Sequence, residues 1–123
     1  MPIIRIEALT DREPDVAGLL REASRAVARA FDVPEKQCWS LWRSIAPGTY
    51  HEGARLRGAG EAAEVSPLVT VSLYRGRSAE QKAAALKGLA AAVGQALGSD
   101  PDNVFVELHE IQEGHVHTGG QVL

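Results

Sequence analysis

The chain carries one sequence pattern twice within its 123 residues. A β-branched run of alternating polarity follows Pro2, and a similar run follows Pro67; in each copy an arginine stands ten positions after the proline, at Arg12 and at Arg77. Apolar residues then recur at three- and four-residue spacing, which is typical of an amphipathic helix. A second β-branched run and a glycine-bearing loop end each copy. This recurrence predicts two copies of one supersecondary unit.

The order of elements in each copy predicts a βαβ unit. We expect first strands over 2–9 and 67–74, helices that end at Phe31 and Leu97, and second strands over 38–45 and 104–111. Pro14 suits the first turn of the first helix, and Ser78 with Gln81 resembles a capping box for the second. Because a helix joins two strands of one sheet, the strands of each unit should be parallel and the crossover right-handed.

The repeat also divides the chain. The first unit covers 2–51 and the second covers 67–123; between them, 52–66 is rich in Gly, Ala, Glu and Arg, and we expect a surface loop there. Half of the chain, roughly 60 residues, buries little surface alone. We therefore expect both units to share one core in a single domain, and an oligomer would bury more.

The composition argues against several classes of protein. A formal net charge of -3 and a pI near 5.8 disfavour nucleic acid or an anionic membrane as a partner. No apolar run approaches the ~20 residues of a membrane span, and the N-terminus lacks a signal-peptide profile. The lone Cys38 allows no internal disulfide and reads as a small buried hydrophobe, so we expect a cytoplasmic protein. The histidines form no convincing metal pattern, and we expect neither metal nor cofactor.

Three segments resemble the 4-oxalocrotonate tautomerase family: Pro2-Ile3-Ile4, the Gly-Arg-Ser-Ala-Glu-Gln-Lys run at 76–82, and the glycine-bearing end at 113–120. The chain resembles two short subunits of that family fused, as in malonate semialdehyde decarboxylase and the cis-3-chloroacrylic acid dehalogenases, and the second half matches better than the first. The resemblance implies an α+β fold with a four-stranded sheet and two helices on one face. It also implies a homotrimer that converts a small enolic or keto acid.

Pro2 can be a base only as the first residue of the chain, because every internal proline nitrogen is an amide. An α-amino group has a pKa of about 7.7–8.0, and apolar surroundings with nearby arginines would lower it toward the range of a good general base. Pro67 is acylated by Ser66 and cannot act in this way. We therefore expect one active site per chain, and it requires the loss of Met1.

The resemblance assigns further residues to the Pro2 site. Arg77 and Arg75 match the arginines that bind the carboxylate or stabilise the enolate, although both could be solvated charges at a helix start. By the pseudo-symmetry of the repeat, Arg12 should face Pro67. As substrate-binding residues we name Tyr50, Trp39, Phe105 and His117. A loop tyrosine could equally pack at the trimer interface, and tryptophans are more often core or interface residues.

Departures from the family pattern limit the reaction. The strand arginine of 4-oxalocrotonate tautomerase corresponds here to Trp39 and Phe105, which disfavours a diacid held at both ends. The acidic residue of the decarboxylase corresponds here to Gln37, and the glutamate of the dehalogenases corresponds to a position near Thr118. Decarboxylation is therefore disfavoured, and so is dehalogenation unless His117 or Glu52 takes the place of that glutamate. We therefore expect a cofactor-independent enol–keto tautomerase for a 2-hydroxydienoate or an enolpyruvate. The alternatives are a hydratase, decarboxylase or dehalogenase of 3-carbon oxoacids or acrylates, and a catalytically silent trimeric binding protein.

Overall fold

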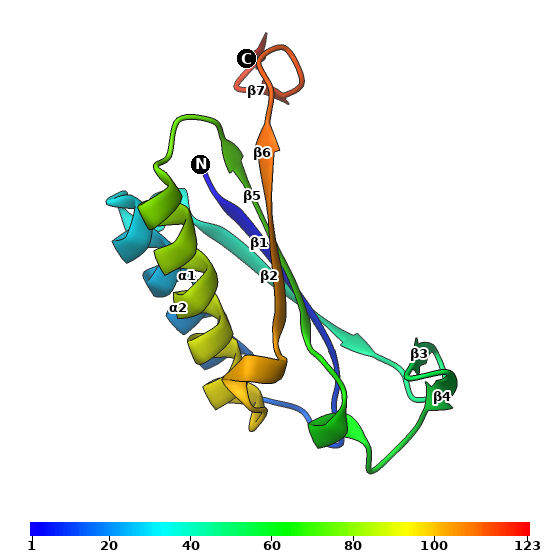
Figure 1. The fold of residues 1–123 in the computed structure, drawn as a ribbon. Helices are drawn as coiled ribbons and strands as arrows, with labels where there is room; N and C mark the ends of the chain where they lie inside the picture. Colours follow the sequence, from blue (N-terminus) through cyan, green and yellow to red (C-terminus); the bar gives the residue numbers. More distant parts are fainter.

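The main sheet has four strands, and both helices lie on one of its faces (Figure 1). The computed structural model describes residues 1–123. The first unit contains β1 (Ile3–Leu9), α1 (Val16–Phe31) and β2 (Trp39–Ile45), and the second contains β5 (Leu68–Tyr74), α2 (Ala79–Leu97) and β6 (Phe105–Ile111). The expected α+β fold of two βαβ units is confirmed.

The strand order β2-β1-β5-β6 places the two units side by side in opposite directions. β1 is parallel to β2, β5 is parallel to β6, and β1 is antiparallel to β5, with Ile3 opposite Ser72. Pro2 and Pro67 therefore lie at opposite ends of the sheet. We call these the Pro2 end, where β1 and β2 begin and β5 and β6 end, and the Pro67 end, where the reverse holds.

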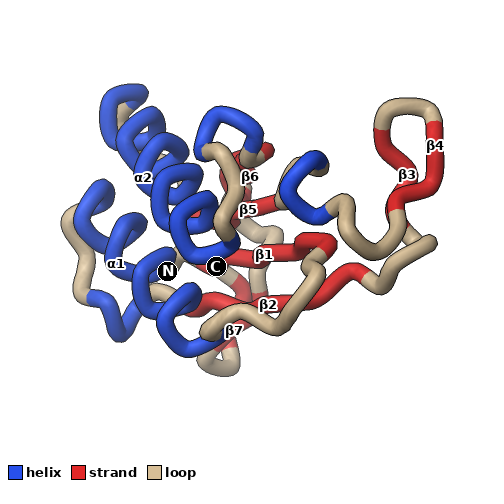
Figure 2. The backbone as a smooth tube through the Cα atoms, turned by 90° about the horizontal axis from the view of Figure 1, so that it is seen from below, coloured by secondary structure: helices blue, strands red, loops and turns tan.

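The core lies between the sheet and the helices, as the view from below shows (Figure 2). Alternate residues of the central strands, such as Ile4 in β1 and Val71 in β5, face the helices and are fully buried. They meet apolar residues that recur along α1 and α2, among them Leu19, Val27, Phe31, Leu89 and Val93. Burying a side chain of this size contributes about 1.5–3 kcal/mol. The other face of the sheet has no helix over it.

Capping residues define where each helix begins and ends. The Asp15 side chain caps α1 by accepting a hydrogen bond from the Gly18 backbone N–H at 3.1 Å. Pro14 therefore precedes the cap, and its expected place in the first turn is wrong. The capping box at α2 is confirmed, since Ser78 and Gln81 exchange hydrogen bonds of 3.0 and 3.1 Å. Each helix is followed by a cap residue in the left-handed region, Asp32 after α1 and Gly98 after α2.

The segment between the units is more ordered than a plain loop. β3 (Tyr50–Glu52) and β4 (Arg55–Arg57) form a short antiparallel hairpin, and a 3-10 turn follows at Ala62–Glu64. Two more 3-10 turns, Glu35–Gln37 and Pro101–Asn103, precede β2 and β6. A second hairpin, of β7 (His117–Thr118) and β8 (Gln121–Val122), follows β6. Neither helix is long and apolar enough to cross a membrane.

Candidate active site

The start of β1 places the terminal amine in a partly enclosed position at the Pro2 end. Pro2 is buried, and its carbonyl accepts a hydrogen bond from the Trp39 backbone N–H at 3.0 Å, which ties the start of β1 to the start of β2. In the full chain the amine belongs to Met1. Burial lowers its pKa most, the Arg77 guanidinium lowers it further, and the Cys38 thiol acts in the opposite direction. An amine with this pKa is more often a free base at neutral pH.

Arg77 is held in place by the first unit. It follows β5, yet its Nη1 donates a hydrogen bond of 3.0 Å to the backbone carbonyl of Phe31, the last residue of α1. The guanidinium carbon also lies 5.4 Å from the centre of the Phe31 ring, within cation–π range. The carboxyl end of a helix carries partial negative charge and favours a cation there. These contacts use one of five N–H donors and leave the others for a ligand.

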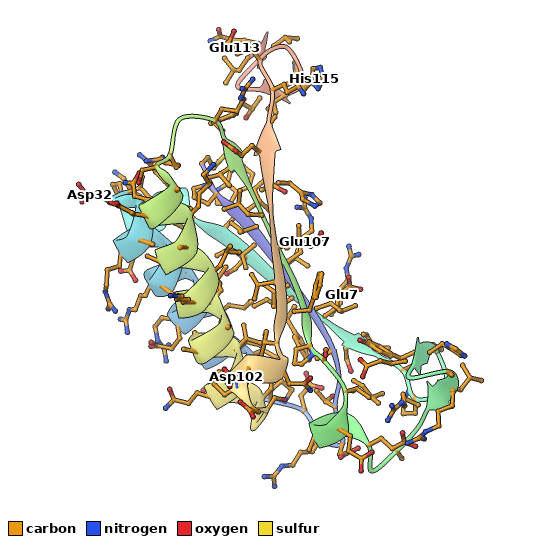
Figure 3. All side chains as sticks on the ribbon, viewed as in Figure 1. Glu7, Asp32, Asp102, Glu107, Glu113 and His115 are labelled. Atoms are coloured by element: carbon orange, nitrogen blue, oxygen red, sulfur yellow. The ribbon has the colours of Figure 1, made fainter.

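Arg75 occupies a different part of the same end. Its side chain is exposed and lines a cavity of about 500 Å³ with residues from the ends of β5 and β6 and from the C-terminus: Tyr74, Ile111, Gln112, Glu113 and Leu123. Figure 3 shows Glu113 on the segment that extends beyond β6. The two predicted arginines are thus both at the Pro2 end, where Arg77 lowers the pKa of the amine and Arg75 lines the cavity toward the C-terminal segment.

The structure brings some of the predicted aromatic residues to this end and not others. Trp39 begins β2 beside Ile3 and is 52% exposed, so its ring offers apolar surface near Pro2. His117 lies on the exposed hairpin beyond β6. Tyr50 and Phe105 lie at the Pro67 end, close to Ser66 and Pro67. The strands are seven residues long, which separates the two ends by roughly 20 Å.

Tyr50 is fixed within the chain by a small polar network. Its hydroxyl lies 2.8 Å from Glu52 Oε2 and 2.9 Å from the Ser66 carbonyl oxygen, and its single hydrogen is shared between these two acceptors. The Ser66 backbone N–H donates to the same Glu52 oxygen at 3.0 Å. Burial and the bond to Glu52 raise the pKa of Tyr50 to about 12. Glu52 therefore joins the β3–β4 hairpin to the residue before Pro67, and Tyr50 can reach a Pro2 site only from a neighbouring chain.

Cys38 and Phe31 were not assigned to the site from the sequence. Cys38 is buried, as expected, burial raises the pKa of its thiol, and the thiol and the terminal amine each shift the pKa of the other. Phe31 read only as an apolar helix residue, yet it holds Arg77. The only sequence signal for this role was a difference between the repeats, because α1 ends in the aromatic Phe31 whereas α2 ends in Leu97.

The other cavities and the charged clusters are less suited to this chemistry. A larger hollow of about 940 Å³ lies on the outer helix face, where α1 and α2 line it mainly with alanines and arginines, away from Pro2. No group of three or more His, Cys, Asp or Glu side chains could hold a metal ion. The Pro2 end combines an amine of lowered pKa with a guanidinium that contributes to the lowering. Such a pair can move a proton while it stabilises a developing negative charge.

Sequence comparisons with known proteins match less than half of the chain. A family model described as "Tautomerase enzyme" matches residues 67–123. A probable tautomerase of Bacillus cereus is 37% identical over 57 residues, which cover 46% of this chain and 93% of that protein. A probable tautomerase of Halalkalibacterium halodurans is 34% identical over 55 residues, which cover 45% of this chain and 90% of that protein. The family model falls on the repeat whose proline is internal.

Solved structures match both repeats together. A fused 4-OT, described as a wild-type symmetric trimer, has a TM-score of 0.83 at 24% identity, covering 98% of this chain and 94% of its own. A malonate semialdehyde decarboxylase has a TM-score of 0.68 at 26% identity, covering 95% of this chain and 90% of its own. The tandem βαβ arrangement is therefore shared along the whole chain.

Proposed function

The chain belongs to the tautomerase family, and from this premise we propose that it is a cofactor-independent enol–keto tautomerase whose general base is the amine of Pro2. The observation that carries the proposal is the position of the terminal amine. It is partly buried at the start of β1, next to Arg77, and both features lower its pKa. Once Met1 is removed, the amine is that of Pro2, one residue closer to the core, where we expect the same two causes to act.

The reaction needs only one base and one cation. The Pro2 amine takes the proton from the 2-hydroxyl group of the enol, the oxygen becomes a carbonyl, and the double bond shifts. The resulting ammonium then returns a proton to carbon, so that the atoms balance and no oxidant is required. Arg77 binds the substrate carboxylate with the donors that Phe31 leaves free, and it stabilises the negative charge of the enolate as that charge develops. Arg75 adds a second cation at the adjoining cavity.

The side chains around Pro2 favour a monoacid with an apolar or aromatic tail. Trp39 stands at the position where a second arginine would hold a second carboxylate, and its ring is half exposed beside Pro2. A 2-hydroxydienoate or an arylenolpyruvate fits this combination of one cationic and one aromatic side. His117 lies beyond the same end of the sheet and is the polar candidate for contact with the substrate.

We also propose that the site is completed in a homotrimer. Tyr50 and Phe105 are separated from Pro2 by the length of the sheet in one chain, so they can contribute only from a neighbouring subunit. Trp39 and Phe105 begin the two edge strands and are 52% and 56% exposed, which suits surfaces that another chain covers. The structurally similar fused 4-OT proteins are trimers.

Ketonisation of phenylenolpyruvate and of 2-hydroxymuconate, followed by ultraviolet absorbance, tests the proposal. The wild-type protein should convert the first substrate faster than the second, and Pro2→Ala should abolish conversion. Unchanged activity of Pro2→Ala would remove Pro2 from the mechanism. An inactive wild-type protein would favour a binding role.

A hydratase or decarboxylase of 3-carbon oxoacids is the second candidate, and the structural likeness to malonate semialdehyde decarboxylase favours it. Gln37 stands where that chemistry would need an acid, so turnover of malonate semialdehyde or of acetylenecarboxylates should be slower than ketonisation.

A further inference from the structure

The two repeat-equivalent arginines have different surroundings. Arg12 and Arg77 each follow their proline by ten positions, and the pseudo-symmetry places each beyond the end of a central strand. Arg77 donates a hydrogen bond to the Phe31 carbonyl and lies over the Phe31 ring. Arg12 is exposed and has neither contact. The tether is therefore present only at the end of the sheet where a terminal amine exists.

The residue at the helix end differs between the two ends of the sheet. Phe31 is the last residue of α1 and Leu97 is the last residue of α2, and each is followed by a cap residue in the left-handed region. Both positions offer a free carbonyl at a helix end, but only Phe31 has an aromatic face. Its ring is 1% exposed and belongs to the core cluster, so it is a rigid surface for the guanidinium. Asp32, which follows it, marks this end of α1 in Figure 3.

We infer that Phe31 is a positioning residue of the proposed tautomerase site, holding the Arg77 guanidinium beside the Pro2 amine before the substrate binds. This inference rests on the proposed function and deepens it. A free arginine loses much rotamer freedom when it binds a carboxylate, whereas a tethered one has lost it already. The preorganised guanidinium then contributes more of its binding energy to the substrate and to the enolate.

The tether also bears on the base itself. The charged and titratable groups that act on the terminal amine are Arg77, from the loop after β5, and Cys38, before β2; Glu35 acts on Cys38 in turn. A cation beside an ammonium lowers the pKa of that ammonium. If Arg77 spends less time at this place, the pKa of the Pro2 amine should therefore rise.

The test is Phe31→Leu, which installs the residue that the second repeat has at the same position. We expect KM for phenylenolpyruvate to rise about 3- to 30-fold, the range that loss of a cation–π contact gives. The acid limb of the kcat/KM pH profile should move to higher pH.

The control is Leu89→Val, a core substitution about 15 Å along α2 from its start, which should leave KM and the pH limb unchanged at a similar loss of thermal stability. Phe31→Tyr, which keeps an aromatic ring face, should leave both KM and the acid limb at their wild-type values.

A titration of ¹⁵N-labelled Pro2 by NMR, in the wild-type protein and in Phe31→Leu, measures the amine directly and does not require turnover. A higher pKa in Phe31→Leu, with the wild-type value in Leu89→Val, supports the positioning role even if no tested substrate reacts. An unchanged pKa and an unchanged KM in a folded Phe31→Leu protein would overturn it, as would equal shifts in Leu89→Val. Failure of the proposed function is seen separately, as an active Pro2→Ala protein.

Discussion

Replacing Arg77 with alanine removes the guanidinium that lowers the pKa of the terminal amine. For stability, the loss comprises one hydrogen bond to the Phe31 carbonyl and one cation–π contact, or about 1.5–2.5 kcal/mol in the free energy of unfolding. For catalysis, the removal of a donor that stabilises a developing charge costs about 10²- to 10³-fold in kcat/KM. The catalytic loss should therefore exceed what a lower folded fraction can explain.

Two other arginines serve as matched controls in the same ketonisation assay. Arg75 is exposed and lines the adjoining cavity, so Arg75→Ala should lower kcat/KM by about 10-fold or less, mainly through KM. Arg12 stands at the equivalent place of the Pro67 end, and Arg12→Ala should stay within about twofold of the wild type. Equal losses in the Arg12 and Arg77 variants, or full activity of Arg77→Ala, would refute the assignment of Arg77.

Three further outcomes follow from the same structure. Glu52→Ala removes a carboxylate that accepts from Tyr50 and Ser66; it should cost about 2–3 kcal/mol in urea unfolding, and a loss no larger than that of an exposed glutamate would contradict the network. Ser78→Ala removes the capping box of α2 and should cost about 1 kcal/mol, measured in the same way. Because burial and Arg77 lower the pKa of the terminal amine, the acid limb of kcat/KM should lie below the pKa of about 8 of an ordinary α-amino group, and a limb above 8 would contradict the site.

Much of the fold was predictable because the sequence contains the βαβ pattern twice. The period of the apolar residues fixed both helices, and the alternating runs after Pro2 and Pro67 fixed the central strands to within a residue of their ends. The Ser78 capping box was visible because its two residues stand three apart in the chain. Patterns between residues close in the chain indicate secondary structure directly, and in this fold the tertiary contacts agree with them.

The β3–β4 hairpin could not be predicted, because its turn lacks the usual sequence signal. Its turn residues, Gly53 and Ala54, both have positive φ, and such turns are normally signalled by Asn-Gly or Asp-Gly pairs. Alanine rarely adopts this conformation, so the segment read as loop. Each strand of the hairpin has only three residues, which is too short for a clear alternation.

The residues of the proposed site remain predictions, and their contacts could not be read from the sequence. The resemblance to fused relatives implied that Arg77 belongs with Pro2, and the antiparallel pairing of β1 with β5 gives the structural reason that Arg77 lies at the Pro2 end. The tether joins residues 46 positions apart, and no local pattern reports such a contact. The position of Tyr50 likewise depends on bonds to Glu52 and Ser66 that form only in the folded chain.

The most direct measurement compares two forms of the same protein that differ only at the N-terminus. One form begins at Pro2, as verified by its intact mass, and the other retains Met1, so that the proline nitrogen is an amide. The form that begins at Pro2 should ketonise phenylenolpyruvate, and the form that retains Met1 should lose at least about 10²-fold in kcat/KM, the low end of what a general base contributes. Equal activity of the two forms would contradict the role of Pro2 as the base.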